Sequence, residues 1–157
     1  MLKIKLLVIG KTKFDYLIKA ENDYLSRLKN FCFLEYTVIE NNQKSKKLSQ
    51  EEVKRKEKDL FFTHIENSEI VILLDERGKL FSSKEFSDWL TEKTLYSTKN
   101  ISFLIGGAFG FHDDLRKRSD FSIAMSKMTF SHQMIRCFFL EQFYRAQTII
   151  HNLPYHH

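Results

Sequence analysis

The chain has 157 residues, a length that suits one compact domain with a buried core rather than two domains. Its hydrophobic share of 43% is typical of a soluble globular protein, and its apolar runs fall short of the roughly 18 residues that a membrane-spanning helix needs. Lysine and arginine outnumber aspartate and glutamate by 25 to 20, which suits a polyanionic partner but also many mildly basic enzymes. We therefore expect a single domain over residues 1–157 and no membrane segment.

The first half of the chain alternates strand and helix patterns. Residues 2–9 form a largely apolar run with lysines inside it and no cleavage site, which predicts a strand rather than a signal peptide. Apolar residues at helical spacing predict a helix over 14–29, and residues 33–39 alternate as a second strand. After a polar loop over 41–48, a capping box at Ser49 opens a charged helix to about residue 65.

The second half continues this alternation. An apolar strand over 70–74 ends at Asp75, a turn is expected at 77–79, and a capping box at Ser82 opens another helix to about residue 90. The remaining predicted elements are strands over 101–105 and 121–125 and a final helix from about 131 to about 150. Strands alternating with helices predict an α/β fold, with a mostly parallel sheet and helices on both faces.

Three loops form the candidate ligand site, because open α/β sheets bind ligands beyond the carboxyl ends of their strands. They follow Leu74, Ile105 and Met125. The loop over 105–110 holds three of the five glycines, which lets the backbone approach a ligand closely. Its G-G-x-x-G spacing does not match the dinucleotide fingerprint G-x-G-x-x-G, and an ordinary strand-to-helix turn is the alternative interpretation.

The loop over 125–132 combines hydroxyls, a lysine and apolar side chains directly before the final helix. A plain connection is the alternative here, with Ser131 as the helix cap and no special role for His132. Apolar residues cover almost the whole circumference of the final helix, which predicts burial on all sides through a subunit interface. Arg136 interrupts that apolar surface. Glu141 and Arg145 have the i,i+4 spacing of an ion pair.

Charged clusters, cysteines and histidines give weaker indications of partners, cellular location and metal binding. Basic residues gather at 44–47, 54–58 and 116–118, as solvated surface charge or as contacts to a polyanion. Cys32 and Cys137 lie far apart in apolar company, which predicts two reduced, buried thiols and a cytoplasmic protein. The histidines have no zinc-type spacing, so no metal is predicted.

Several motifs, in one order along essentially the whole chain, resemble the ribosomal RNA large subunit methyltransferase H family of the SPOUT superfamily. They are residues 8–11, Leu74 with Asp75, Gly78 with Lys79, residues 105–110, residues 126–130 with His132, residues 141–146 and residues 154–156. Any one of them is weak, but their order and spacing together are specific. Ser131 departs from the family, which usually has proline there; serine can still cap the helix.

The resemblance implies a deep trefoil knot near the C-terminus, a rarity that pattern reasoning never proposes. It also implies a homodimer and S-adenosylmethionine as the cofactor, bound by the same three loops. The residues implied to line the cofactor site are Leu74, Gly106, Met125, Ser126, Lys127, Met128, Thr129 and Phe130.

The implied reaction is methylation of N3 of a pseudouridine in a 23S rRNA stem-loop, on assembled ribosomes. The sulfonium already makes the methyl group electrophilic, so the reaction needs no metal. The residues expected to approach the base are His132, Arg136, Tyr155 and His156, with Arg136 holding an RNA phosphate. The sequence does not identify which of them, if any, is the general base.

Two other functions are compatible with the residues themselves. A noncatalytic RNA-binding protein would use the basic clusters alone and would not bind S-adenosylmethionine. Another α/β enzyme would act on a nucleotide or small molecule without RNA. Titration with S-adenosylmethionine and a methyl-transfer assay on rRNA, subunits and ribosomes distinguish the three.

Overall fold

Five strands form one sheet in the computed structural model, which describes residues 3–41 and 47–155. They are β1 (Ile4–Ile9), β2 (Leu34–Ile39), β3 (Ile70–Leu80), β4 (Ile101–Ile105) and β5 (Phe121–Ala124). Their order across the sheet is β2-β1-β4-β3-β5, and every neighbouring pair is parallel. The predicted α/β class with a parallel sheet is therefore confirmed.

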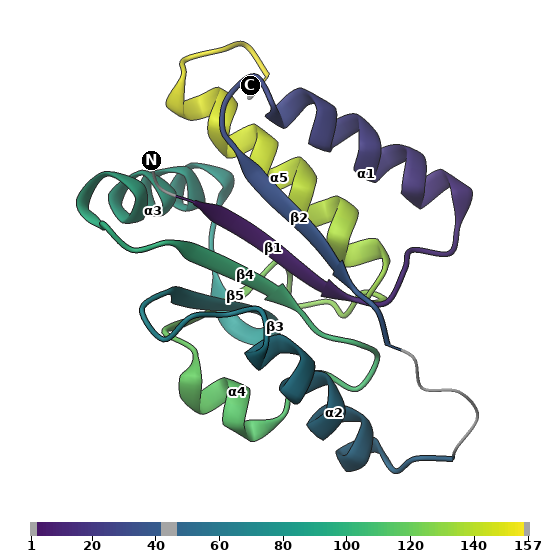
Figure 1. The fold of residues 1–157 in the computed structure, drawn as a ribbon. Helices are drawn as coiled ribbons and strands as arrows, with labels where there is room; N and C mark the ends of the chain where they lie inside the picture. The colour runs from purple at the N-terminus through teal and green to yellow at the C-terminus, as the bar shows by residue number, and fades with distance from the viewer. Residues whose placement is uncertain (1–2, 42–46, 156–157) are drawn as a thin grey trace.

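Helices cover both faces of this sheet (Figure 1). One face carries α1 (Asp15–Leu28), α3 (Ser83–Tyr96) and α5 (Met134–Ile150), and the other carries α2 (Gln50–Phe62) and α4 (Asp113–Arg118). Alternate residues of β1 point to opposite faces, so Leu6 joins the core under α5 while Leu7 joins the core under α2. A strand buried on both faces has no solvent-facing side, which explains the largely apolar run at the N-terminus; its one charged residue, Lys5, is buried and pairs with Glu69.

Local capping chemistry sets the starts of two helices as predicted. The Ser49 side chain accepts the backbone N–H of Glu52, whose carboxylate accepts the N–H of Ser49, and Ser82 and Glu85 repeat this arrangement. The helix α2 ends at Phe62, a little before the predicted end. Within the described part of the chain, no helix is long and apolar enough to cross a membrane.

The predicted turn at residues 77–79 is wrong, because β3 continues through it to Leu80. Ile123 of β5 is aligned with Leu74 and again with Lys79, so residues 75–78 bulge out between two paired stretches. A Cβ at Gly78 would lie 2.5 Å from the backbone nitrogen of Ile123, and only glycine permits this approach. The bulge directs residues 75–77 toward the ends of β4 and β5.

The short helix α4 is not predicted by the sequence pattern. Its acidic first turn and basic last turn suit the helix dipole, but six residues are too few for a periodic apolar pattern. Two members of the basic cluster at 116–118 are used inside the fold. Arg116 pairs with Asp75, and Arg118 donates to the carbonyl oxygens of Glu66, Asn67 and Glu69.

Most of the apolar circumference of α5 is covered within one chain, by α1, α3 and the sheet. Phe139 and Phe143 have no exposed surface, whereas Phe138 is 41% exposed. The predicted ion pair of Glu141 with Arg145 is present at 2.6 Å. The apolar pattern of α5 therefore reflects mainly the core of this chain and leaves a narrow exposed strip.

The expectations for the two cysteines and for the first basic cluster are met only in part. Cys137 is buried, but Cys32 is only half-buried, and both thiols are free. Burial raises the pKa of each thiol to about 11. Lys44 and Lys46 of the first basic cluster lie outside the described residues.

Candidate functional site

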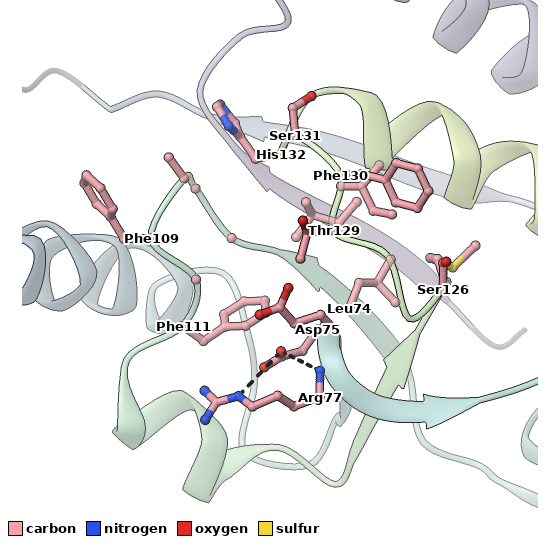
Figure 2. A pocket seen from close by; sticks show the side chains of 18 of the residues that line it. Leu74, Asp75, Arg77, Phe109, Phe111, Ser126, Thr129, Phe130, Ser131 and His132 are labelled. Atoms are coloured by element: carbon pink, nitrogen blue, oxygen red, sulfur yellow. Dashed lines mark hydrogen bonds and ion pairs between the residues drawn. The ribbon is translucent and has the colours of Figure 1, made fainter.

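A cavity of about 830 Å³ lies where the three predicted segments meet, at the bulge of β3 and the carboxyl ends of β4 and β5. We call it the loop cavity. Figure 2 shows side chains from all three loops around this common space. Seven of the eight predicted cofactor residues line it: Leu74, Gly106, Met125, Ser126, Met128, Thr129 and Phe130. Lys127 is the exception and is not part of the lining.

An ion pair that sequence reasoning missed stands in the wall of the loop cavity. Asp75, whose side chain is 6% exposed, binds the guanidinium of Arg116 from α4 and accepts the backbone N–H of Arg77 at 3.1 Å (Figure 2 shows the contacts of Asp75 with Arg77). Within the described residues, Arg116 Nε is buried without a hydrogen-bond partner. This wall therefore places a carboxylate and a guanidinium, paired with one another, beside the space for a polar ligand.

A buried carboxyl group supports the glycine loop from behind. Glu57 of α2 is 5% exposed, and its Oε2 accepts the backbone N–H of Gly107 at 3.3 Å. A Cβ at Gly107 would overlap Oε1 of the same carboxyl group, so a larger residue here would displace the Glu57 side chain. Burial raises the pKa of Glu57, and the hydrogen bond from Gly107 opposes that rise only in part.

We expect Glu57→Gln to stabilise the protein at neutral pH. Because the folded pKa of Glu57 lies above its unfolded value, folding favours the protonated carboxyl, and stability is lost as the pH rises through the folded pKa. Glutamine keeps an acceptor for Gly107 and carries no charge. Urea unfolding should therefore show a gain for Glu57→Gln at pH 7.5 that shrinks toward pH 4.

The matched control is Glu51→Gln on the same helix, where the carboxylate is 68% exposed and pairs with Lys54. This change should leave stability unchanged or slightly lower at pH 7.5, because exposed ion pairs contribute little. Equal or lower stability of Glu57→Gln than wild type at pH 7.5 would contradict the assignment of a charge-burial cost to Glu57.

The segment before α5 brings His132 to the edge of the loop cavity (Figure 2). Ser131 supports the first turn of the helix, since its Oγ accepts the N–H of Met134 and its carbonyl accepts that of Ile135, both at 3.1 Å. Burial lowers the pKa of His132, and the positive charges of Arg136 and Lys13 lower it further. The imidazole is therefore neutral at pH 7 and able to accept a proton.

The structure contradicts the prediction that Arg136 holds an RNA phosphate. Its side chain has no exposed surface. The guanidinium donates to the carbonyl oxygens of Ile9 at 2.6 Å and Gly10 at 2.8 Å, and to Thr12 Oγ1 at 3.1 Å. The Thr12 hydroxyl in turn donates to the buried carboxylate of Glu21 at 2.6 Å. Arg136 therefore ties α5 to the end of β1.

Tyr155 lies at the opposite end of α5 from His132. Its hydroxyl donates to Glu141 Oε1 at 3.2 Å, and its ring packs against Tyr144 at 4.8 Å between centroids. Tyr155 is not among the residues that line the loop cavity of its own chain. His156 lies outside the described residues.

Metal binding finds no support in the part of the chain that the structure describes. Among those residues, no group of three or more His, Cys, Asp and Glu side chains is arranged to hold an ion.

Comparison with known proteins identifies the class to which this fold and site belong. The family described as "Predicted SPOUT methyltransferase" matches residues 2–156. A solved structure of a probable methylase family protein from Haemophilus influenzae superimposes with a TM-score of 0.58 at 12% identity, over 98% of this chain and 70% of that one. That likeness concerns the fold alone.

Two curated relatives narrow the class. The chain is 45% identical to ribosomal RNA large subunit methyltransferase H of Christiangramia forsetii, over 98% of both chains. It is 44% identical to the protein of the same name from Parabacteroides distasonis, over 99% of both chains. The chain therefore belongs to the SPOUT methyltransferases, in the ribosomal RNA large subunit methyltransferase H family, and the resemblance seen in its motifs is confirmed.

Proposed function

We propose that this protein methylates large-subunit ribosomal RNA with S-adenosylmethionine as the methyl donor, at N3 of a pseudouridine in a 23S rRNA stem-loop. The observation that carries the proposal is the loop cavity, which is built by the bulge of β3 and the ends of β4 and β5 and is lined by seven of the eight residues that the family motifs indicate. Its volume of about 830 Å³ falls within the range of small-molecule sites.

The lining suits the cofactor's mixed chemistry. Apolar side chains such as Leu74, Ile123 and Met125 can enclose an adenine ring, and the backbone groups of the glycine loop can bond its edge. The carboxylate of Asp75 and the guanidinium of Arg116 suit hydroxyl, ammonium and carboxylate groups. When bound, S-adenosylmethionine supplies an electrophilic methyl carbon on its sulfonium.

The protein's own task is to position the base and to help it lose a proton. Alignment of reacting groups contributes on the order of 7–11 kcal/mol in favourable systems. His132, neutral at pH 7 at the cavity edge, is our candidate to accept the imide proton. Activity that depends on neutral His132 should fall as the pH drops through its lowered pKa and stay level above it.

We propose that the active unit is a homodimer working on assembled ribosomes in the cytoplasm. Exposed aromatic side chains support this assembly: Phe130 and Phe138, each 41% exposed, contact one another at the surface with 4.8 Å between ring centroids. In such a dimer, Tyr155 and His156 of one copy would serve the loop cavity of the other. The trefoil knot implied by the family belongs to the same proposal.

Two measurements test the function. Calorimetric titration should show S-adenosylmethionine binding at one site per chain, which a purely RNA-binding protein would lack. Methyl transfer should then be compared on free 23S rRNA, large subunits and whole ribosomes from a strain lacking the enzyme, with mass spectrometry locating the modified nucleotide. Methylation of ribosomes at pseudouridine N3 is expected; turnover without RNA would favour another α/β enzyme.

A further inference from the structure

A second cavity, of about 510 Å³, opens at the carboxyl ends of β1 and β2. We call it the β1 cavity. It shares Gly107, Ala108, Phe109 and His132 with the loop cavity, so the same short wall separates the two. A methyl acceptor must lie within about 3–3.5 Å of the methyl carbon, so its site must adjoin the cofactor's. The β1 cavity meets this requirement.

Cationic side chains stand at the rim of the β1 cavity. Lys11 pairs with Glu40 at 3.4 Å, but both side chains are largely exposed, at 77% and 61%. Such a pair contributes little, so a phosphate can replace the carboxylate. Lys13 is exposed, and its backbone N–H donates to Gln133 Oε1 at 2.8 Å, which fixes its loop to the start of α5. The rim is thus suited to the backbone of a nucleic acid.

The shared wall presents an aromatic ring on a rigid support. Phe109 is 46% exposed and lines both cavities, on the same side of the site as His132 (Figure 2). The buried Glu57 also lines the β1 cavity and holds the neighbouring Gly107 through its N–H. An exposed ring beside lysines is the arrangement by which proteins bind an unstacked base and its phosphates.

Another cavity adjoining the loop cavity has a different character. It measures about 360 Å³ and lies between α3 and α5, lined by aromatic residues such as Phe81, Phe86 and Phe138. It carries Glu141, and neither lysine nor arginine is among the described residues that line it. The described lining of this cavity offers no positive charge to bind a polyanion. We assign it instead to contact with the second copy of the chain.

We propose that the β1 cavity receives the nucleotide to be methylated, with its base against Phe109 and its flanking phosphates on Lys11 and Lys13. The base would leave its stack, as enzymes that modify bases require, and present its reacting nitrogen at His132, where the two cavities meet. This inference rests on the proposed function and deepens it by locating the RNA.

Two variants of the intact protein test this placement, each beside a matched control. Phe109→Ala is compared with Tyr96→Ala, an aromatic ring that is 85% exposed on α3. At saturating S-adenosylmethionine, Phe109→Ala should lower kcat/KM for ribosomes roughly 5- to 150-fold, the loss expected for one stacked base, and Tyr96→Ala should not.

Lys13→Ala is compared with Lys99→Ala, an exposed lysine on the loop before β4, at the amino end of that central strand and away from the β1 cavity. Loss of one phosphate contact should reduce the salt dependence of ribosome binding by about one unit of slope, with calorimetric affinity for S-adenosylmethionine unchanged. Lys99→Ala should change neither quantity.

The outcomes separate the two levels of the proposal. If wild type is active on ribosomes and Phe109→Ala and Lys13→Ala match it, the placement of the nucleotide is wrong while the function stands. If Lys13→Ala loses cofactor affinity instead, the β1 cavity belongs to the cofactor. Wild type that binds S-adenosylmethionine but methylates no RNA overturns the proposed function and this inference with it.

Discussion

Replacing Arg136 with alanine is expected to lower the free energy of unfolding by about 3–5 kcal/mol, because it breaks a buried charged network from one side. The change would leave the carbonyl oxygens of Ile9 and Gly10 without their donors. It would also leave the buried carboxylate of Glu21 facing a Thr12 hydroxyl that no longer contacts a guanidinium. Urea unfolding with circular dichroism measures the loss.

Arg77→Ala is the control, since the side chain of Arg77 is 69% exposed and lies 3.9 Å from Asp75. Its removal should change the free energy of unfolding by less than about 1 kcal/mol. If Arg136→Ala unfolds at the wild-type urea concentration but binds ribosomes more weakly, Arg136 is a phosphate-binding residue after all. Equal effects of Arg77→Ala and Arg136→Ala would contradict the special role of the buried network.

Features that depend on neighbouring residues could be predicted from the sequence. The capping boxes at Ser49 and Ser82 involve side chains three residues apart, and the apolar runs of the strands follow from burial on both faces. The place of the loop cavity was also predictable, because the rule for parallel sheets pointed to the segments after Leu74, Ile105 and Met125, although β3 bulges after Leu74 and does not end there.

Long-range pairings could not be predicted in this way. Asp75 and Arg116 are 41 residues apart, and Arg136 lies 126 residues from the carbonyl of Gly10 that it binds. When its partners are unknown, an arginine on an apolar helix is easily interpreted as a surface or ligand-binding residue. The positions of Glu57 and Phe109 likewise depend on where α2 and the glycine loop meet, which periodicity does not reveal.

Replacing Phe138 with aspartate is expected to separate the proposed dimer into monomers and to abolish methyl transfer while the chain stays folded. Phe138 is 41% exposed and packs on Phe130 in the lining of the cavity between α3 and α5, so its replacement leaves the core of the monomer in place. At an interface, an unpaired carboxylate costs several kcal/mol, which raises the dissociation constant roughly 100-fold or more. Sedimentation at micromolar concentration measures the change.

Two further variants, Phe139→Asp and Leu95→Asp, are the controls for Phe138→Asp. Phe139 has no exposed surface and packs on Phe103 at 4.9 Å between ring centroids, so an aspartate there should unfold the chain itself. Leu95 is 70% exposed near the end of α3, so an aspartate there should affect neither folding nor assembly. A folded Phe138→Asp variant that stays dimeric would place the interface elsewhere. A folded, monomeric variant that methylates ribosomes at the wild-type rate would show that one copy suffices, and that Tyr155 of a second copy has no part in the reaction.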